Sequence, residues 1–207
     1  VRYHFVHVLY QNALYGSLTP TRKVVLSAAV ANSLLACQGE RSSESASELG
    51  FLFEAARDLP RASHHFLVPA QNAVRVFAKR EALVLARRGL DALRTLPESS
   101  DRDERELALL LTLAAPLAVV KGYADAEVAE TLTRAQSVWR SGVPQRLSII
   151  AGLWACYTIR AKADASRDLA EQFLAVAQTQ QEPALLIEAY GRLGTALFNL
   201  GEFRLAL

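Results

Sequence analysis

Residues that start and stop helices recur at short intervals along the whole chain. Thr19 before Pro20 is a helix N-cap followed by proline at the first helical position, and Gly39 can end the helix that follows. The pairs Leu59-Pro60 and Leu96-Pro97 mark further boundaries. A chain divided in this way is expected to fold as a series of short helices.

These divisions predict eleven helices joined by connections of a few residues. Composition favours helix throughout, since 35 alanines and 33 leucines make up about a third of the 207 residues and both are strong helix formers. No segment has the pattern of a strand. The predicted helices span 4–16, 20–38, 43–57, 60–77, 79–95, 101–121, 125–141, 145–162, 165–180 and 184–200, with a last one from 202. Short connections make consecutive helices antiparallel neighbours, so the predicted fold is an all-α row of helix hairpins.

Charge and hydropathy argue against several kinds of partner. The formal net charge is only +2, which disfavours a nucleic-acid-binding surface. The longest uncharged apolar run, 107–120, falls short of the ~20 residues that cross a bilayer, and we expect no membrane partner. Cys37 and Cys156 are isolated, as expected in a reducing cytoplasm. The chain has no methionine, and we expect it to be a segment of a longer polypeptide.

A repeat pattern is clearest at the end of the chain. Seven residues stand at relative positions 4, 7, 8, 11, 15, 17 and 20: Tyr190, Leu193, Gly194, Leu197, Gly201, Phe203 and Ala206. Small residues at positions 8 and 20 let two helices approach closely, larger residues fill the space between them, and glycine at position 15 makes the turn. This run resembles the first half of a tetratricopeptide repeat.

Earlier segments repeat the pattern less completely. Positions 4, 11, 20, 24 and 27 are filled by Trp154, Ala161, Ala170, Leu174 and Ala177, and positions 4, 8, 11, 20 and 24 by Phe66, Ala70, Ala73, Ala82 and Ala86. The segment 101–141 fits loosely and is equally well described as an irregular helical hairpin. The resemblance implies a tetratricopeptide-like, right-handed superhelix of antiparallel helix hairpins over 39–207. Pro69 and Pro116 fall inside predicted helices, where each should produce a bend or a hinge.

The N-terminal segment 1–38 carries a second resemblance. Tyr3, Phe5, His7, Leu9, Tyr15, Leu18, Arg22 and Leu26 are similar to the end of the helical region that follows the ATPase module in STAND-type NTPases. Lys121-Gly122-Tyr123, Ala126-Glu127-Val128 and Leu153-Trp154 resemble segments of the same proteins. Ser27 departs from the pattern, which often has histidine there. The resemblance implies the C-terminal arm of a bacterial regulator, linked to a cyclase or to transcription, and suggests that His7 senses a bound nucleotide.

Patterns typical of enzymes are absent from the sequence. It has no phosphate-binding loop, HExxH, GxSxG or clustered acidic set, so we expect no catalysis, cofactor or metal. His4 and His7 lie three residues apart and could chelate a metal, or form an ordinary polar face. His64 and His65 point about 100° apart on a helix and cannot form one site alone. A basic cluster, either a solvated face or a site for an acidic partner or nucleic acid, comprises Arg75, Lys79, Arg80, Arg87 and Arg88.

Together these features predict a non-catalytic scaffold that binds a partner protein or effector on its concave face and controls an adjacent module. One alternative is a small-molecule sensor with an apolar cavity near Trp139, Trp154, Tyr157 and Phe198. An enzyme or a nucleic-acid binder would need titratable residues or a basic stripe assembled in space. Leu193, Leu197 and Leu200 form an apolar face that we expect to be partly uncovered, which predicts self-association through 184–207.

Overall fold

The computed structural model describes residues 8–38 and 43–206. The described residues form eleven α-helices and no strand, so the all-α prediction is confirmed, and every expected boundary that falls among them lies within three residues of the observed one. The helices are α1 (Val8–Ser17), α2 (Pro20–Gln38), α3 (Ser43–Ala55), α4 (Leu59–Arg75), α5 (Lys79–Leu93), α6 (Ser100–Lys121), α7 (Ala126–Val138), α8 (Val143–Ile159), α9 (Ala163–Gln180), α10 (Pro183–Asn199) and α11 (Phe203–Ala206).

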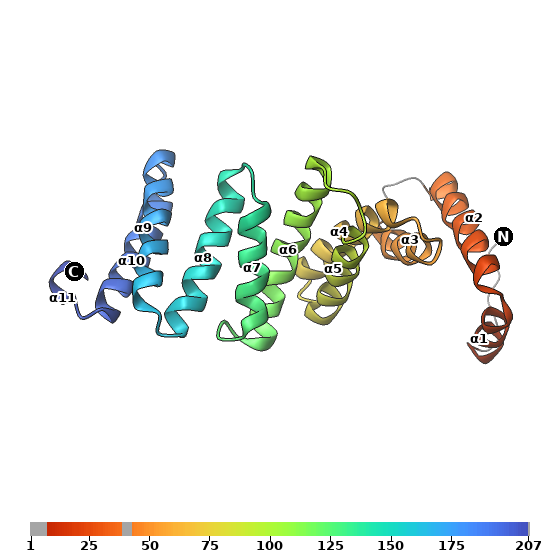
Figure 1. Cartoon of the computed structure of the whole chain (residues 1–207), viewed down its shortest axis with the longest axis horizontal. Helices are drawn as coiled ribbons and strands as arrows, with labels where there is room; N and C mark the ends of the chain where they lie inside the picture. The colour runs from red at the N-terminus through yellow and green to blue at the C-terminus, as the bar shows by residue number, and fades with distance from the viewer. Residues whose placement is uncertain (1–7, 39–42, 207) are drawn as a thin grey trace.

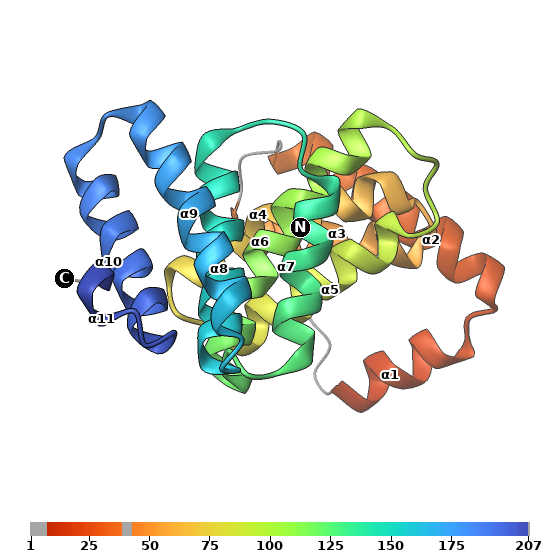
Figure 2. The ribbon, with the colours of Figure 1, turned by 60° about the vertical axis from the view of Figure 1, so that its left-hand side comes forward.

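The helices are arranged in a row, with α1 and α2 at one end and α10 and α11 at the other (Figure 1). From α2 onward each helix packs against the next one in the chain. In addition α4 contacts α6 and α6 contacts α8. The even-numbered helices from α4 to α8 therefore form one continuous layer, which Figure 2 shows from a second direction.

Four connections share one turn geometry. In each, a single residue adopts the left-handed conformation: Arg57 (φ 59°), Phe77 (φ 58°), Ala161 (φ 55°) and Gly201 (φ 79°). The amide of the following residue then donates to a carbonyl five residues earlier, as in Asp58 to Phe53 at 2.9 Å and Glu202 to Leu197 at 3.0 Å. This is the Schellman arrangement, which satisfies carbonyls at a helix end.

The repeat assignment numbered from Trp154 is wrong at Ala161, because this residue lies in a turn. Numbering from Trp154 places Ala161 inside the first helix of its unit, but α8 ends at Ile159 and Ala161 lies in the turn. Ala161 therefore corresponds to Gly201 in the last hairpin. Ala170 lies nine residues after this turn and Ala206 five after its own, so the two alanines are not equivalent. The assignment numbered from Phe66 needs no such change, since Phe77 falls at its turn position.

The best-packed part of the row surrounds α4. Phe53 and Phe66 are fully buried, and a Cβ placed on Gly50 would lie 2.7 Å from the Phe66 ring. Glycine at that position therefore lets α3 approach α4 closely. Pro69 and Pro116 are buried inside α4 and α6, and both helices continue past them. Within the described part of the chain, no helix is long and apolar enough to cross a membrane.

Candidate binding groove

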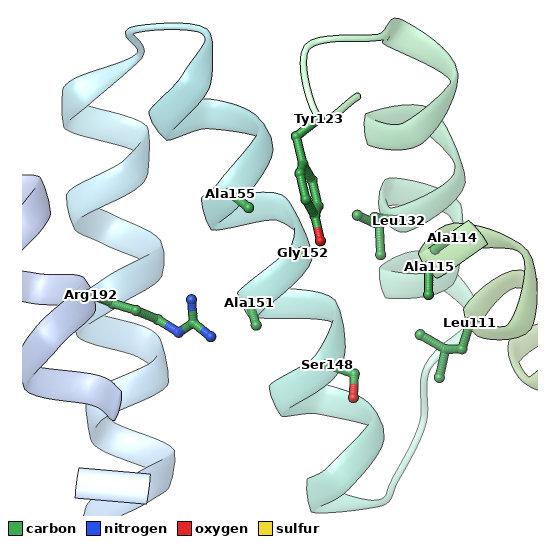
Figure 3. A pocket seen from close by; sticks show the side chains of 10 residues that line it. All are labelled: Leu111, Ala114, Ala115, Tyr123, Leu132, Ser148, Ala151, Gly152, Ala155 and Arg192. Carbon is green, nitrogen blue, oxygen red and sulfur yellow. The ribbon is translucent and has the colours of Figure 1, made fainter. Parts of the chain in front are cut away.

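A groove of about 370 Å³ runs along α8, with residues of α6 and α7 on one side of that helix and Arg192 of α10 on the other (Figure 3). Its α8 wall consists of small residues spaced three or four apart, namely Ser148, Ala151, Gly152 and Ala155. This spacing puts them on one face of the helix. Their small side chains leave space beside the helix, except at Gly152, where Leu132 of α7 packs.

Opposite this wall, α6 contributes Leu111, Ala114 and Ala115, and α7 contributes Leu132. A Cβ on Gly152 would lie 2.7 Å from Cδ1 of Leu132. Glycine at 152 thus permits the close packing of α7 against α8 that sets the width of the groove.

Arg192 of α10 is the charged residue among those that line the groove. Its guanidinium carbon lies 4.8 Å from the centre of the Trp154 ring and 4.9 Å from that of Phe173. Two aromatic rings hold the group by cation–π attraction. One terminal nitrogen pairs with Glu188, and the side chain is 17% exposed.

Two nitrogen atoms near this position have no hydrogen-bond partner in the structure. They are Nε of Arg192 and Nε1 of Trp154, and both atoms are buried. A buried donor without a partner carries a desolvation cost of about 1–3 kcal/mol. An acceptor brought into the groove would relieve that cost if it reached either nitrogen.

Two hydroxyl groups add polar character to the groove. Tyr123 follows Gly122, whose φ of 83° ends α6, and its hydroxyl points into the groove (Figure 3). Ser148 donates its hydroxyl proton to the carbonyl of Pro144 at 2.9 Å, which leaves its oxygen able to accept. Donors and acceptors therefore line an otherwise apolar channel.

The groove continues toward α4. A neighbouring depression of about 580 Å³ is lined by Gln71 of α4, Glu104 of α6 and Gln145 of α8, and shares Leu111 with the first. One continuous face therefore runs across α4, α6, α8 and α10. It carries a carboxylate at Glu104 and a guanidinium at Arg192.

Of the residues predicted to pack the last repeat, some are in contact and others are exposed to solvent. A Cβ on Gly194 would lie 3.1 Å from the carbonyl oxygen of Ala206, so α10 and α11 approach closely there. Tyr190 and Phe203, however, are each 57% exposed, and Gly201 is exposed in its turn. The expectation that these two rings fill the space between helices is wrong, because both are more than half exposed where α10 packs mainly against α9 and the four-residue α11.

Other predicted packing residues lie partly or fully inside the molecule. Ala170 is fully buried, and Trp154, Leu193 and Leu197 are partly buried. His4 and His7 lie outside the described residues. Among the residues that the structure describes, no group of three or more His, Cys, Asp or Glu side chains could hold a metal.

The four aromatic residues expected around an apolar cavity do not line a common depression in the described part of the chain. Trp139 lines a depression of about 230 Å³ with Arg146, Tyr157 lines another beside α7, and Phe198 lines a third at the C-terminal end. Trp154 instead contacts Arg192. Although Trp154 and Tyr157 lie three residues apart on α8, Tyr157 lines the depression beside α7 while Trp154 packs against Arg192 of α10.

The basic cluster is divided by ion pairs. Arg87 pairs with Glu127 at 2.6 Å and Arg88 pairs with Glu54, so each joins α5 to a neighbouring odd-numbered helix. A hydrogen bond from Lys121 lowers the pKa of Glu127 below its ordinary value. Arg75, Lys79 and Arg80 remain exposed.

Comparison with protein-family models and with curated proteins finds no match to this chain. The residues that line the groove are therefore the basis for assigning it a ligand. Arg192 was not predicted from the sequence, although it stands between Tyr190 and Leu193 of the repeat pattern. An arginine beside packing positions on a first repeat helix is the signal that could have identified it.

Proposed function

We propose that this chain is a non-catalytic, tetratricopeptide-like scaffold of a multidomain regulator, and that the groove around Arg192 binds a segment of a partner protein. The observation that carries the proposal is a guanidinium held between two aromatic rings, with an unpartnered Nε, beside an open channel. In a solenoid the first helices of successive hairpins present such a face.

The ligand we favour is a peptide segment that carries a carboxylate. Arginine binds carboxylates strongly because its planar donors can make paired, charge-assisted hydrogen bonds. The competing Glu188 is 47% exposed, and an exposed pair within one helix contributes only about 0.3–0.5 kcal/mol. The small residues of α8 leave room for the backbone of the segment.

A small-molecule effector is the second candidate. The volume of about 370 Å³ falls in the range of ligand sites, roughly 300–1,000 Å³. Ala115 and Ser148 in its lining are exposed, however, so the channel opens to solvent. An open channel suits an extended segment better than a ligand that must be enclosed.

Intrinsic fluorescence provides the test, because the chain has two tryptophans and only Trp154 touches Arg192. A Trp139→Phe variant is titrated with a library of peptides bearing glutamate or aspartate, and with single amino acids and small dicarboxylates. We expect peptides to shift Trp154 emission and Arg192→Gln to weaken binding at least tenfold. In a matched Trp154→Phe variant the emission comes from Trp139, and we expect the same peptides to leave that emission unchanged.

A shift in Trp154 emission with small dicarboxylates alone would favour a small-molecule effector as the ligand. If neither the peptides nor the small molecules shift the emission, the groove is not the binding site. The absence of catalysis is tested separately. ATP hydrolysis by the purified chain that a point substitution within it abolishes would contradict a scaffold role.

We also propose self-association through 184–207. Ile187, Tyr190, Phe198 and Leu205 are all more than half exposed there, and exposed apolar surface of this kind favours association. Sedimentation should show concentration-dependent dimers that Phe198→Ser with Leu205→Ser removes. A monomer at high concentration would contradict this.

A further inference from the structure

The connections that follow the even-numbered helices α6, α8 and α10 lie along one edge of the row. The connections α6–α7, α8–α9 and α10–α11 appear at the lower edge in Figure 1, while α5–α6, α7–α8 and α9–α10 appear at the upper edge. Adjacent members of the lower edge are in contact, since the Arg160 guanidinium donates to the carbonyl of Ala124 at 3.0 and 3.1 Å. We call the segments 119–124 and 159–162, together with the segment 75–80 of the connection α4–α5, which also runs from an even-numbered to an odd-numbered helix, the turn edge.

Large apolar side chains project from the turn edge. Phe77 is 81% exposed and Val76 72%, and the next two turns present Val119, Val120 and Ile159, each more than half exposed. In the alternating connections, 94–100, 139–142 and 180–183, none of the exposed large hydrophobic residues occurs. The exposure is therefore a property of one edge and not of turns in general.

Cations accompany these apolar side chains. The turn edge contains Arg75, Lys79, Arg80, Lys121, Arg160 and Lys162, and one carboxylate of the same connections, Asp125 at the end of α6–α7, lies 4.0 Å from Lys121. Lys121 pairs with Glu127, just beyond its segment. The alternating connections contain Glu98 and Glu182 instead, together with Arg94 and Arg140. The two edges therefore differ in charge as well as in hydropathy.

Phe77 is held outward by an unfavourable backbone conformation. Its φ of 58° lies in the left-handed region, which costs a residue with a side chain free energy that glycine would not lose. Gly201 fills the equivalent position in the last hairpin. The local fold therefore gives no reason for a phenylalanine at 77.

We propose that the turn edge docks peripherally on an anionic lipid surface. Isolated apolar side chains between cations fit the boundary between head groups and acyl chains, where the cations meet lipid phosphates and carboxylates. Valine and isoleucine cannot stack on bases, which makes a single-stranded nucleic acid a poorer fit. A protein partner would require a contiguous apolar centre, whereas here cations separate the apolar tips. Such docking needs no spanning helix.

Vesicle co-sedimentation with the 207-residue chain tests this, using phosphatidylcholine vesicles with and without phosphatidylserine. We expect binding only to the anionic vesicles, weakening as salt rises. Lys79→Gln with Arg80→Gln should lower the partition coefficient about 30-fold. Phe77→Gly should lower it about tenfold by removing the ring, while its thermal midpoint stays the same or rises.

Arg57→Gln with Arg94→Gln removes two exposed cations from the connections α3–α4 and α5–α6, which lie outside the turn edge, and serves as the matched control, with an expected change below about twofold. Equal losses in both double variants would overturn the proposal, because they would show a non-specific charge effect. So would the absence of binding to anionic vesicles, equally strong binding to neutral ones, or tight binding to an oligothymidylate probe that anionic vesicles fail to displace.

Discussion

The hairpin α4–α5 and the hairpin α10–α11 share a turn and a pattern of small residues, yet they differ in burial. Counted from the left-handed residue of each turn, Ala70 and Gly194 occupy one position and Ala82 and Ala206 another. Ala70 and Ala82 are fully buried, whereas Gly194 and Ala206 are only partly buried. Two hairpins with the same turn and the same small residues therefore differ in how deeply those residues are buried.

The difference is largest eleven residues before the turn. Phe66 stands there in α4 and is fully buried, and Tyr190 stands there in α10 and is 57% exposed. Helices α3, α5 and α6 all pack against α4, whereas α10 packs against α9 and the short α11. A helix in a row is buried by its neighbours on both sides, so local sequence sets the turn and the neighbours set the stability.

Replacing the aromatic residue eleven positions before the turn with alanine should show the largest difference between the two hairpins. Phe66→Ala is expected to lower the free energy of unfolding by about 3–5 kcal/mol, because it opens a cavity among α3, α4 and α5. Tyr190→Ala should cost less than about 1 kcal/mol, since most of its ring already contacts water. Urea melts of both variants measure the difference. Equal losses would show that α10 is as well covered as α4.

The same contrast shows what the sequence could predict. All eleven helices were found because caps, prolines and glycines act within a few residues. The numbering from Phe66 agrees with a turn at Phe77, while the numbering from Trp154 placed the turn residue Ala161 inside a helix. Neither turn residue is glycine, the residue that usually signals a left-handed conformation. Arg192 was missed because its importance depends on Trp154 and Phe173, which lie on other helices. Contacts between helices leave little trace in a single sequence.

A bulky side chain at Gly194 tests how firmly α11 is docked. Gly194→Leu should cost about 1–3 kcal/mol, because its Cβ would meet the backbone carbonyl of Ala206 and cannot be relieved by a rotamer change. Gly191 lies on the same helix with no atom within 4 Å of a built Cβ, so Gly191→Leu should be neutral or stabilising. If chemical denaturation finds both substitutions neutral, α11 does not stay packed on α10.

Exchanging turn residues tests the shared left-handed geometry. Phe77→Gly should raise the free energy of unfolding by about 0.5–1 kcal/mol, and Gly201→Ala should lower it by about 1 kcal/mol, since only glycine adopts this conformation at no cost. Calorimetry of the two variants gives the signs. A destabilising Phe77→Gly would mean that the exposed ring contributes to folding after all.

The smallest expected loss of stability comes from removing ion pairs. An ion pair between hairpins can be compared with one inside a single helix. Glu127 of α7 accepts from Arg87 of α5 at 2.6 Å and from Lys121 at the end of α6 at 2.5 Å. Among the residues that the structure describes, Glu188 pairs with Arg192 alone, four residues along the same helix. Glu127→Gln should cost about 0.5–1 kcal/mol and Glu188→Gln less than about 0.5 kcal/mol, because the first carboxylate joins three helices and the second joins none.

The pH dependence separates the contribution of Glu127 from a simple loss of packing. The hydrogen bond from Lys121 lowers the pKa of Glu127 in the folded chain, so the folded state releases this proton more readily than the unfolded state. The stabilisation is therefore complete above the ordinary glutamate pKa and disappears as pH falls through the lowered value. Urea melts at several pH values should show wild type and Glu127→Gln converging in acid. A constant difference at every pH would mean that the glutamine disturbs the contact between α5 and α7 by its shape and not by its charge.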